Sequence, residues 1–195
     1  NKPIIAITLG DPAGVGPEIV VKALKNKEIY YQCKPLVIGD YEVLRKALEI
    51  TKSSLKLNVV SKPDEGKYTL GTIDYINLNN IDISKLEYGK VQAQCGQAAF
   101  DYLSYAIKLA LDKKVTAIAT TPLNKESFKA AGVPYIGHTE VLEKLTNTPD
   151  PLTMFEVRGL KVFFYSRHVP LRKACELITK EGIEKFIVRC EKALK

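Results

Sequence analysis

The sequence predicts an α/β fold, in which strands and helices alternate and the strands form an open, mostly parallel sheet. Two observations support this prediction. Short apolar runs rich in β-branched residues alternate with segments of helical periodicity through the first half of the chain. Hydrophobic residues make up 46% and charged residues 26% of the 195 residues, a balance typical of a globular protein that buries a sizeable core.

The predicted strands and helices alternate over the first 120 residues. Strands are expected over residues 3–9, 35–39, 55–60, 73–78 and 115–120. The first helix, over 17–26, has a proline in its first turn and one apolar face made of Ile19, Val20, Ala23 and Leu24. A second helix is capped by Asp40 and brings together Val43, Leu44, Ala47 and Leu48. A third, over roughly 90–112, repeats apolar residues at three- and four-residue steps.

The pattern changes after residue 150. Two apolar runs, 152–157 and 160–166, flank Arg158 and Gly159, which predicts an antiparallel hairpin. We therefore expect a first α/β domain over 1–148 and the start of a second, incomplete α/β domain over 149–195. An amphipathic helix runs to the last residue without a glycine stop signal, so we expect the chain to be cut short. The stripe of this helix consists of Ile183, Phe186, Ile187, Cys190 and Leu194.

Charge and cysteine content narrow the class of protein. The net charge of +7 comes from lysines and arginines spread along the chain. This distribution indicates either a solvated basic surface or a general attraction for anionic small substrates. Because the charges form no block, we expect no nucleic-acid partner. Cysteines 33, 95, 175 and 190 stand far apart, so we expect small core residues in a reducing compartment. No apolar run is long enough to span a bilayer, and we expect a cytoplasmic protein with no membrane partner.

Two stretches join strands to helices and could carry chemistry. The first, GDPAGVGPE (residues 10–18), holds glycines 10, 14 and 16, which suit either a tight turn or a cradle for a phosphate or cofactor. In the second, TTPLNKES (120–127), Asn124 can cap a helix and place Lys125 near the ligand-binding edge of the sheet. The alternative for Lys125 is an ordinary solvated lysine.

Both histidines are candidates for a site. In GHTE (137–140), His138 and Thr139 precede an apolar helix that begins near Val141, and the alternative is that Thr139 is only its N-cap. His168 follows the predicted hairpin, and histidine is the commonest metal ligand. A catalytic zinc needs about three protein ligands, so the two histidines leave a structural role for His168 open.

Four stretches together resemble the 4-hydroxythreonine-4-phosphate dehydrogenase family: ITLGDPAGVGPEIV, GKVQAQCGQAAFDYL, ATTPLNKESFKAAGVPYIGHTEVL and DPLTMFEVRGLKVFFYSRHVPLRKACELIT. The resemblance implies a three-layer α/β/α fold like that of isocitrate and isopropylmalate dehydrogenases, here lacking its C-terminal part. It also implies a homodimer that uses NAD and a divalent metal, such as Zn, Mg or Co, to oxidise and decarboxylate 4-phosphohydroxy-L-threonine in pyridoxal phosphate biosynthesis. The DPLTMFEVRGL stretch resembles the branch of D-threonate and D-erythronate 4-phosphate dehydrogenases, which gives the alternative substrates.

The resemblance also implies roles for three residues. His138 and Thr139 would contact the small phosphorylated hydroxy-acid substrate, and His168 would be a metal ligand. Arg167 departs from a threonine of other members but leaves His168 aligned. The family's other two metal histidines lie in N-P-H and Y-H-D-Q-G stretches that this chain lacks. Catalytic and cofactor-binding residues stay unassigned.

Two other hypotheses remain open at this point. The first is that these 195 residues form a catalytically silent fragment of such an enzyme, because the expected ligand set is incomplete. The second is an acyl- or phosphoryl-transfer enzyme, which rests on fold analogy alone.

Overall fold

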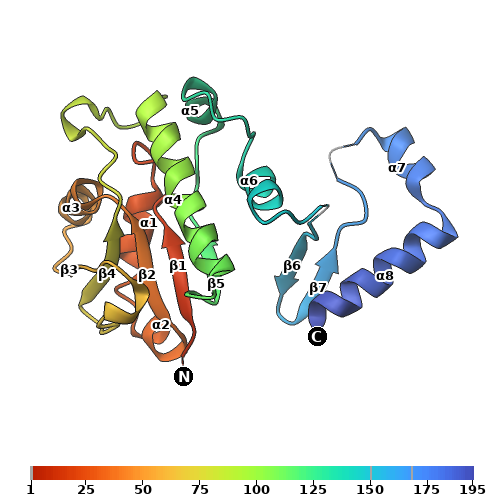
Figure 1. Ribbon diagram of the computed structural model, residues 1–195, viewed down its shortest axis with the longest axis horizontal. Helices are drawn as coiled ribbons and strands as arrows, with labels where there is room; N and C mark the ends of the chain where they lie inside the picture. The colour runs from red at the N-terminus through yellow and green to blue at the C-terminus, as the bar shows by residue number, and fades with distance from the viewer. Residues whose placement is uncertain (1, 150, 168) are drawn as a thin grey trace. The chain divides into compact units, whose positions relative to one another are not determined.

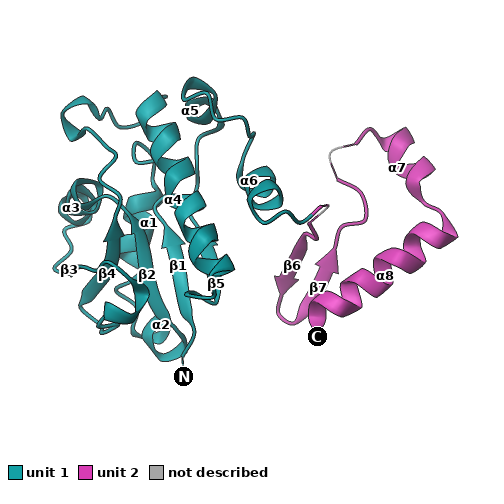
Figure 2. Cartoon of the chain, viewed as in Figure 1, with its two compact units in different colours: residues 1–148 teal, residues 149–195 magenta. Residues whose placement is uncertain are grey.

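The computed structural model describes residues 2–149, 151–167 and 169–195. The chain divides into two compact units, residues 1–148 and 149–195, which are described separately (Figures 1 and 2).

Unit 1 contains a sheet of five parallel strands in the order β3-β4-β2-β1-β5 (Figure 1). The strands are β1 (Ile4–Thr8), β2 (Lys34–Gly39), β3 (Lys56–Val59), β4 (Thr72–Asn77) and β5 (Ala117–Thr120). Strands β1, β3 and β5 lie inside the predicted runs, whereas β2 and β4 each begin one residue earlier, at Lys34 and Thr72. These short, β-branched segments suit a half-buried or buried strand. In the register of the sheet, Thr8 at the end of β1 pairs with Ile38 of β2 and Thr120 of β5.

Helices cover both faces of this sheet. The side chains of Leu36, Val37 and Ile38 in β2 are each 0% exposed, and successive strand residues point to opposite faces. Unit 1 is therefore a three-layer α/β/α arrangement. Its helices are α1 (Gly16–Ala23), α2 (Lys27–Gln32), α3 (Tyr41–Ile50), α4 (Ala93–Leu111), α5 (Lys125–Ala130) and α6 (His138–Leu145), with short 3₁₀ turns at Pro63–Glu65 and Ile83–Lys85.

The first predicted helix is wrong at its C-terminal end. Helix α1 stops at Ala23, and a separate helix, α2, starts after Asn26, whose side chain accepts a hydrogen bond from the Glu28 backbone at 3.0 Å. The predicted apolar face is also partly wrong, since Ile19 is 44% exposed. Val20, Val21 and Leu24 form the buried face instead.

Asp40 precedes α3 but does not cap it through its side chain, which corrects the sequence prediction. Its carboxylate accepts hydrogen bonds from the backbone of Asn80 (2.8 Å) and Ile81 (3.3 Å) and from the Tyr102 hydroxyl (2.7 Å). The backbone N–H of Tyr41 donates instead to the side chain of Asn77 at the end of β4. Asp40 thus joins the loop after β4 to α4. The predicted packing of α3 through Val43, Leu44 and Ala47 is confirmed.

A second apolar cluster holds α5 and α6 against α4. Phe128 of α5 and Val141 of α6 are fully buried beside Ala99, Leu103 and Ile107 of α4. Around this cluster, Phe100 stacks on Tyr135 with ring centroids 5.8 Å apart. The segments that carry the predicted site residues are therefore fixed to the long helix.

Unit 2 contains the predicted hairpin, which is confirmed. Strands β6 (Met154–Val157) and β7 (Leu160–Phe163) pair antiparallel, and both turn residues, Arg158 and Gly159, have positive φ angles of 49° and 85°. Two helices follow, α7 (Leu171–Leu177) and α8 (Lys180–Leu194). None of the residues described in unit 2 is buried.

The cysteines agree only in part with the expectation of core residues. All four are free; Cys95 is buried, while Cys175 is exposed. Cys33 and Cys190 are half-buried. No helix within the described ranges is both long enough and apolar enough to cross a membrane.

Candidate functional site

The strand order of unit 1 reverses at β1. The chain passes from β1 to β2 on one side, and β5 later pairs with β1 on the other side. The loops that follow β1 and β5 therefore meet: the backbone N–H of Asp11 donates to the carbonyl of Pro122 at 3.1 Å, and the Thr121 hydroxyl donates to the carbonyl of Thr8 at 2.9 Å. The carboxyl ends of parallel strands at such a reversal are the usual ligand-binding position in open α/β sheets.

Two glycines of the first loop allow its backbone to pack closely against neighbouring backbone segments. Gly10 has a φ angle of 67°, and a Cβ there would overlap the carbonyl oxygen of Pro122. A Cβ at Gly16 would overlap the carbonyl oxygen of Leu9. Only Gly14 has room, with its nearest neighbour in Asp11 at 3.4 Å. Of the two alternatives left by the sequence, the structure supports the tight strand-to-helix turn at Gly10 and Gly16.

A buried polar cluster lies under these loops, and the sequence did not predict it. Asp11 is 4% exposed, and its carboxylate accepts the Ala13 backbone N–H at 2.8 Å. The side chains of Ser127 and Cys95, both fully buried, hydrogen-bond to the same carboxylate. Burial raises the pKa of Asp11, although these hydrogen bonds oppose the shift. Burial, reinforced by the Asp11 charge, raises the pKa of the Cys95 thiol to about 12, so Cys95 stays protonated.

Helix α5 begins where the sequence predicts, because Asn124 caps it. The Asn124 side chain accepts hydrogen bonds from the backbone of Glu126 (2.9 Å) and Ser127 (3.1 Å). Lys125 is thus the first helical residue, close to the end of β5. Its Cε atom lies 3.8 Å from the position that a Cβ on Gly137 would occupy. The lysine stem therefore runs beside the backbone that leads into His138.

His138 is the first residue of α6, and Gly137 is the N-cap. This corrects the alternative in which Thr139 caps a helix starting near Val141. Burial lowers the pKa of His138, and a hydrogen bond with the Thr121 backbone opposes this shift. The structure therefore brings His138 to the loop after β5, and the imidazole is neutral at pH 7. Thr139 is the next residue and is exposed.

Glu140 fixes how the chain enters α6. Its carboxylate reaches back to the backbone N–H of Ile136 at 2.7 Å, while the N–H of Val141 donates to the Gly137 carbonyl at 3.2 Å. These bonds satisfy N–H groups around the helix start. The hydroxyl of Thr139 is consequently not needed as a cap.

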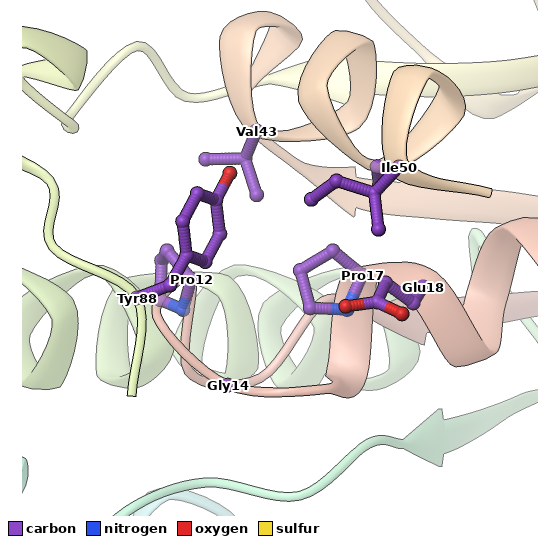
Figure 3. Close-up of a pocket in the computed structure, with 8 residues that line it drawn as sticks. Pro12, Gly14, Pro17, Glu18, Val43, Ile50 and Tyr88 are labelled. Carbon is purple, nitrogen blue, oxygen red and sulfur yellow. The ribbon is translucent and has the colours of Figure 1, made fainter. Parts of the chain in front are cut away.

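A small hollow lies beside the glycine loop, between α1 and α3 and next to Tyr88 (Figure 3). It encloses about 180 Å³, including space open to solvent. None of that space is wide enough to admit a water molecule, so the hollow does not form an enclosed ligand pocket. Neither His138 nor Thr139 lines it; the lining residues are Pro12, Gly14, Pro17, Glu18, Val43, Ala47, Ile50 and Tyr88.

His168 lies outside the described residues, so the structure does not place it relative to His138. Within the ranges that the structure describes, no three histidine, cysteine, aspartate or glutamate side chains form a group that could hold a metal ion. The described side chains thus do not provide a complete donor set for the divalent metal that the resemblance implies.

Comparison with known proteins identifies relatives of this chain. The model of the family described as pyridoxal phosphate biosynthetic protein PdxA matches residues 31–195. A protein of Clostridium botulinum is 57% identical over 195 residues, and one of Halalkalibacterium halodurans is 54% identical over 195 residues. Both carry the assigned name D-threonate 4-phosphate dehydrogenase. Each match covers 100% of this chain and 58% of the relative, so the chain spans little more than half their length.

A solved structure extends the comparison to the fold. The 4-hydroxythreonine-4-phosphate dehydrogenase from Burkholderia phymatum superposes with a TM-score of 0.92 at 39% identity. The superposition covers 100% of this chain and 58% of that protein. The α/β fold class predicted from the sequence, and the family suggested by its motifs, are therefore confirmed.

Proposed function

Because this chain belongs to the family of the pyridoxal phosphate biosynthetic protein PdxA, we propose that the complete protein is a NAD-dependent dehydrogenase acting on D-threonate 4-phosphate. The choice of D-threonate 4-phosphate as the substrate rests on the 54–57% sequence identity with relatives whose names contain this acid. Identity is 39% with a structure named for 4-hydroxythreonine 4-phosphate. D-erythronate 4-phosphate, of the same chemical class, is the nearest variant of this proposal.

His138 and Thr139 are the proposed substrate-binding residues. His138 is half-buried and stands against the loop after β5, where its neutral ring can donate one hydrogen bond and accept another. Thr139 has an exposed hydroxyl that the start of α6 does not use. Two such groups on adjacent residues of a fixed helix can hold a hydroxy acid in one orientation, which lowers the entropic cost of reaction.

The cofactor and the metal are part of the proposal. NAD supplies the chemistry of the oxidation by accepting hydride from the carbon that carries the reacting hydroxyl. We keep His168 as one ligand of a divalent metal, since its SRHVPLR stretch matches the family motif. Further ligands would lie in the part of the relatives that this chain does not cover.

The test is NADH formation by the full-length protein. D-threonate 4-phosphate, D-erythronate 4-phosphate and 4-phosphohydroxy-L-threonine are compared by kcat/KM, with a divalent metal added and then removed by a chelator. The proposal predicts the highest kcat/KM for D-threonate 4-phosphate and a loss of turnover with the chelator. A folded protein that oxidises none of the three acids would contradict it.

A second candidate substrate is 4-phosphohydroxy-L-threonine, with decarboxylation of the oxidised product. It is favoured by the description of the family model and by the name of the Burkholderia phymatum structure. A kcat/KM highest for this acid in the same experiment, together with release of carbon dioxide, would select it over D-threonate 4-phosphate.

We further propose that residues 1–195 by themselves are catalytically silent. The chain spans 58% of its relatives, and no residue described in unit 2 is buried, so the described residues of this unit form no core of their own. Zinc affinity and turnover should be measured on these 195 residues. Tight stoichiometric zinc binding, or NADH formation, would contradict this proposal. A homodimer and a cytoplasmic location remain part of the proposal for the complete protein.

A further inference from the structure

Lys125 is a positively charged residue at the candidate site, and the proposed function assigns it no role. It directly follows the loop after β5, and the Asn124 cap fixes the backbone on which it stands. Its Cε atom lies 3.8 Å from the position of a Cβ on Gly137. Gly137 immediately precedes His138 and Thr139, so the lysine stem runs along the segment that carries both proposed substrate contacts.

The charge of Lys125 has no partner among the described residues. Several of the described lysines pair with an acidic residue three or four positions away, for example Lys46 with Glu49 and Lys90 with Glu87. The positions three and four away from Lys125 hold Pro122, Thr121, Phe128 and Lys129, and none of these is acidic. The carboxylate of Glu140, on the segment that follows Gly137, accepts a hydrogen bond from the Ile136 backbone. Lys125 is an exposed residue, so its side chain is accessible to an anion.

The proposed substrate contains anionic groups that could bind this ammonium group. A 4-phosphorylated hydroxy acid carries a carboxylate at one end and a phosphate at the other. Hydrogen bonds between an ammonium and either group are shorter and stronger than those between neutral partners. The lysine stem lies at van der Waals distance from the position of a Cβ on Gly137, beside the His138 segment.

We infer that Lys125 is a further substrate-binding residue, whose ammonium group binds an anionic group of the hydroxy acid held by His138 and Thr139. The inference deepens the proposed function and rests on it. Carboxylate and phosphate share this chemistry, and the competition experiment described below distinguishes them.

The test compares Lys125→Ala, Lys125→Arg and Lys129→Ala in the full-length protein. Lys129 is an exposed lysine on the same helix and serves as the matched control. Lys125→Ala should raise KM for the phosphorylated acid at least about tenfold, as expected for loss of a charge-assisted hydrogen bond. KM for NAD should not change, and Lys125→Arg should recover most of the affinity. All variants should unfold at the temperature of the wild type.

Competitive inhibitors identify the bound group. If Lys125 binds phosphate, Lys125→Ala weakens inhibition by inorganic phosphate. If it binds carboxylate, the variant weakens inhibition by the non-phosphorylated acid. A KM for Lys125→Ala within about twofold of wild type would overturn the inference. So would a lowered kcat with unchanged KM that arginine does not rescue, because that result indicates proton transfer.

A binding measurement separates the role of Lys125 from the proposed dehydrogenase activity. If the wild type oxidises none of the acids, calorimetric binding of D-threonate 4-phosphate still tests Lys125. Binding by wild type that Lys125→Ala abolishes would support the inference without turnover. Equal binding by both proteins, or none by the wild type, would overturn it.

Discussion

Gly96 of α4 packs directly against the backbone of Ser127 in α5, so that a Cβ on Gly96 would overlap the Ser127 carbonyl. This contact lies beside the Asp11 carboxylate, to which Ser127 hydrogen-bonds. The position of α5, and with it that of Lys125, therefore depends on a glycine in the first turn of α4.

Gly96→Ala should destabilise unit 1. Alanine is a better helix former than glycine by about 1 kcal/mol, which alone would stabilise α4. The overlap with backbone outweighs this gain, because overpacking costs roughly 1–3 kcal/mol and a carbonyl cannot rotate away like a side chain. Chemical denaturation measures the net effect. Gln97→Ala on the exposed side of α4 is the control, and a Gly96→Ala protein more stable than wild type would contradict the packing described here.

Tyr102→Phe should lower the free energy of unfolding by about 1–3 kcal/mol. The Tyr102 hydroxyl donates to the buried Asp40 carboxylate at 2.7 Å, and both residues are at most 3% exposed. Removing the donor leaves Asp40 with only two backbone partners. The matched control is Tyr105→Phe in the same helix, whose hydroxyl has no hydrogen bond among the described residues. Equal stability of the two variants would count against the role of Asp40.

The effect of Asp11→Asn on stability should depend on pH. The pKa of Asp11 is raised above 3.8 in the folded protein by burial, so the folded state holds this proton more tightly than the unfolded state. The contribution of Asp11 to stability is therefore present below pH 3.8 and is lost as pH rises through the folded pKa. The stability of Asp11→Asn relative to wild type should thus increase over this range. Denaturation at a series of pH values from acid to neutral measures it, and a difference independent of pH would contradict the burial.

The pH dependence of activity should report His138. Because burial lowers its pKa below 6.5, the ring is neutral at pH 7 and gains a proton only in more acidic solution. In the full-length enzyme, kcat/KM for the phosphorylated acid should hold constant from neutral pH down to about pH 6.5 and decline below it. His138→Gln should lack this decline and show a raised KM. A wild-type decline centred well above pH 6.5 would be the opposite of what the burial predicts.

Residues 149–195 should not fold by themselves. None of the residues described in this unit is buried, and several large apolar side chains, such as Leu171 (81% exposed) and Leu160 (67% exposed), face solvent. A unit without a core cannot offset the loss of chain entropy. Circular dichroism of this segment should show no cooperative unfolding transition, whereas residues 1–148 should show one. A sharp transition in the isolated segment would refute the prediction.

The sequence predicts the features of this chain that depend on short, local stretches of residues. The strands of unit 1, α4 and the Arg158–Gly159 turn follow from periodicity and turn chemistry, and so does the Asn124 cap. Helix α2 escapes prediction because it has only six residues, and its Asn26 cap falls inside the apparent first helix. The bonds that join distant segments, such as Asp40 to Tyr102 and Asp11 to Ser127, have no local signal.

The candidate site was predictable only in part for the same reason. GHTE and TTPLNKES stand out as polar stretches between apolar elements, but nothing local shows that Lys125 runs beside Gly137. The strand order decides this, since it places the ends of β1 and β5 together. His168 remains a prediction from its motif.

In the proposed function, the segment beginning at His138, at the carboxyl ends of β1 and β5, binds the phosphorylated acid. The most direct test is a crystal structure of the full-length protein with D-threonate 4-phosphate. We expect the acid to lie within hydrogen-bond distance of the His138 ring and the Thr139 hydroxyl, with an anionic group facing Lys125. An acid bound away from all three residues, for example in the hollow beside Tyr88, would contradict it.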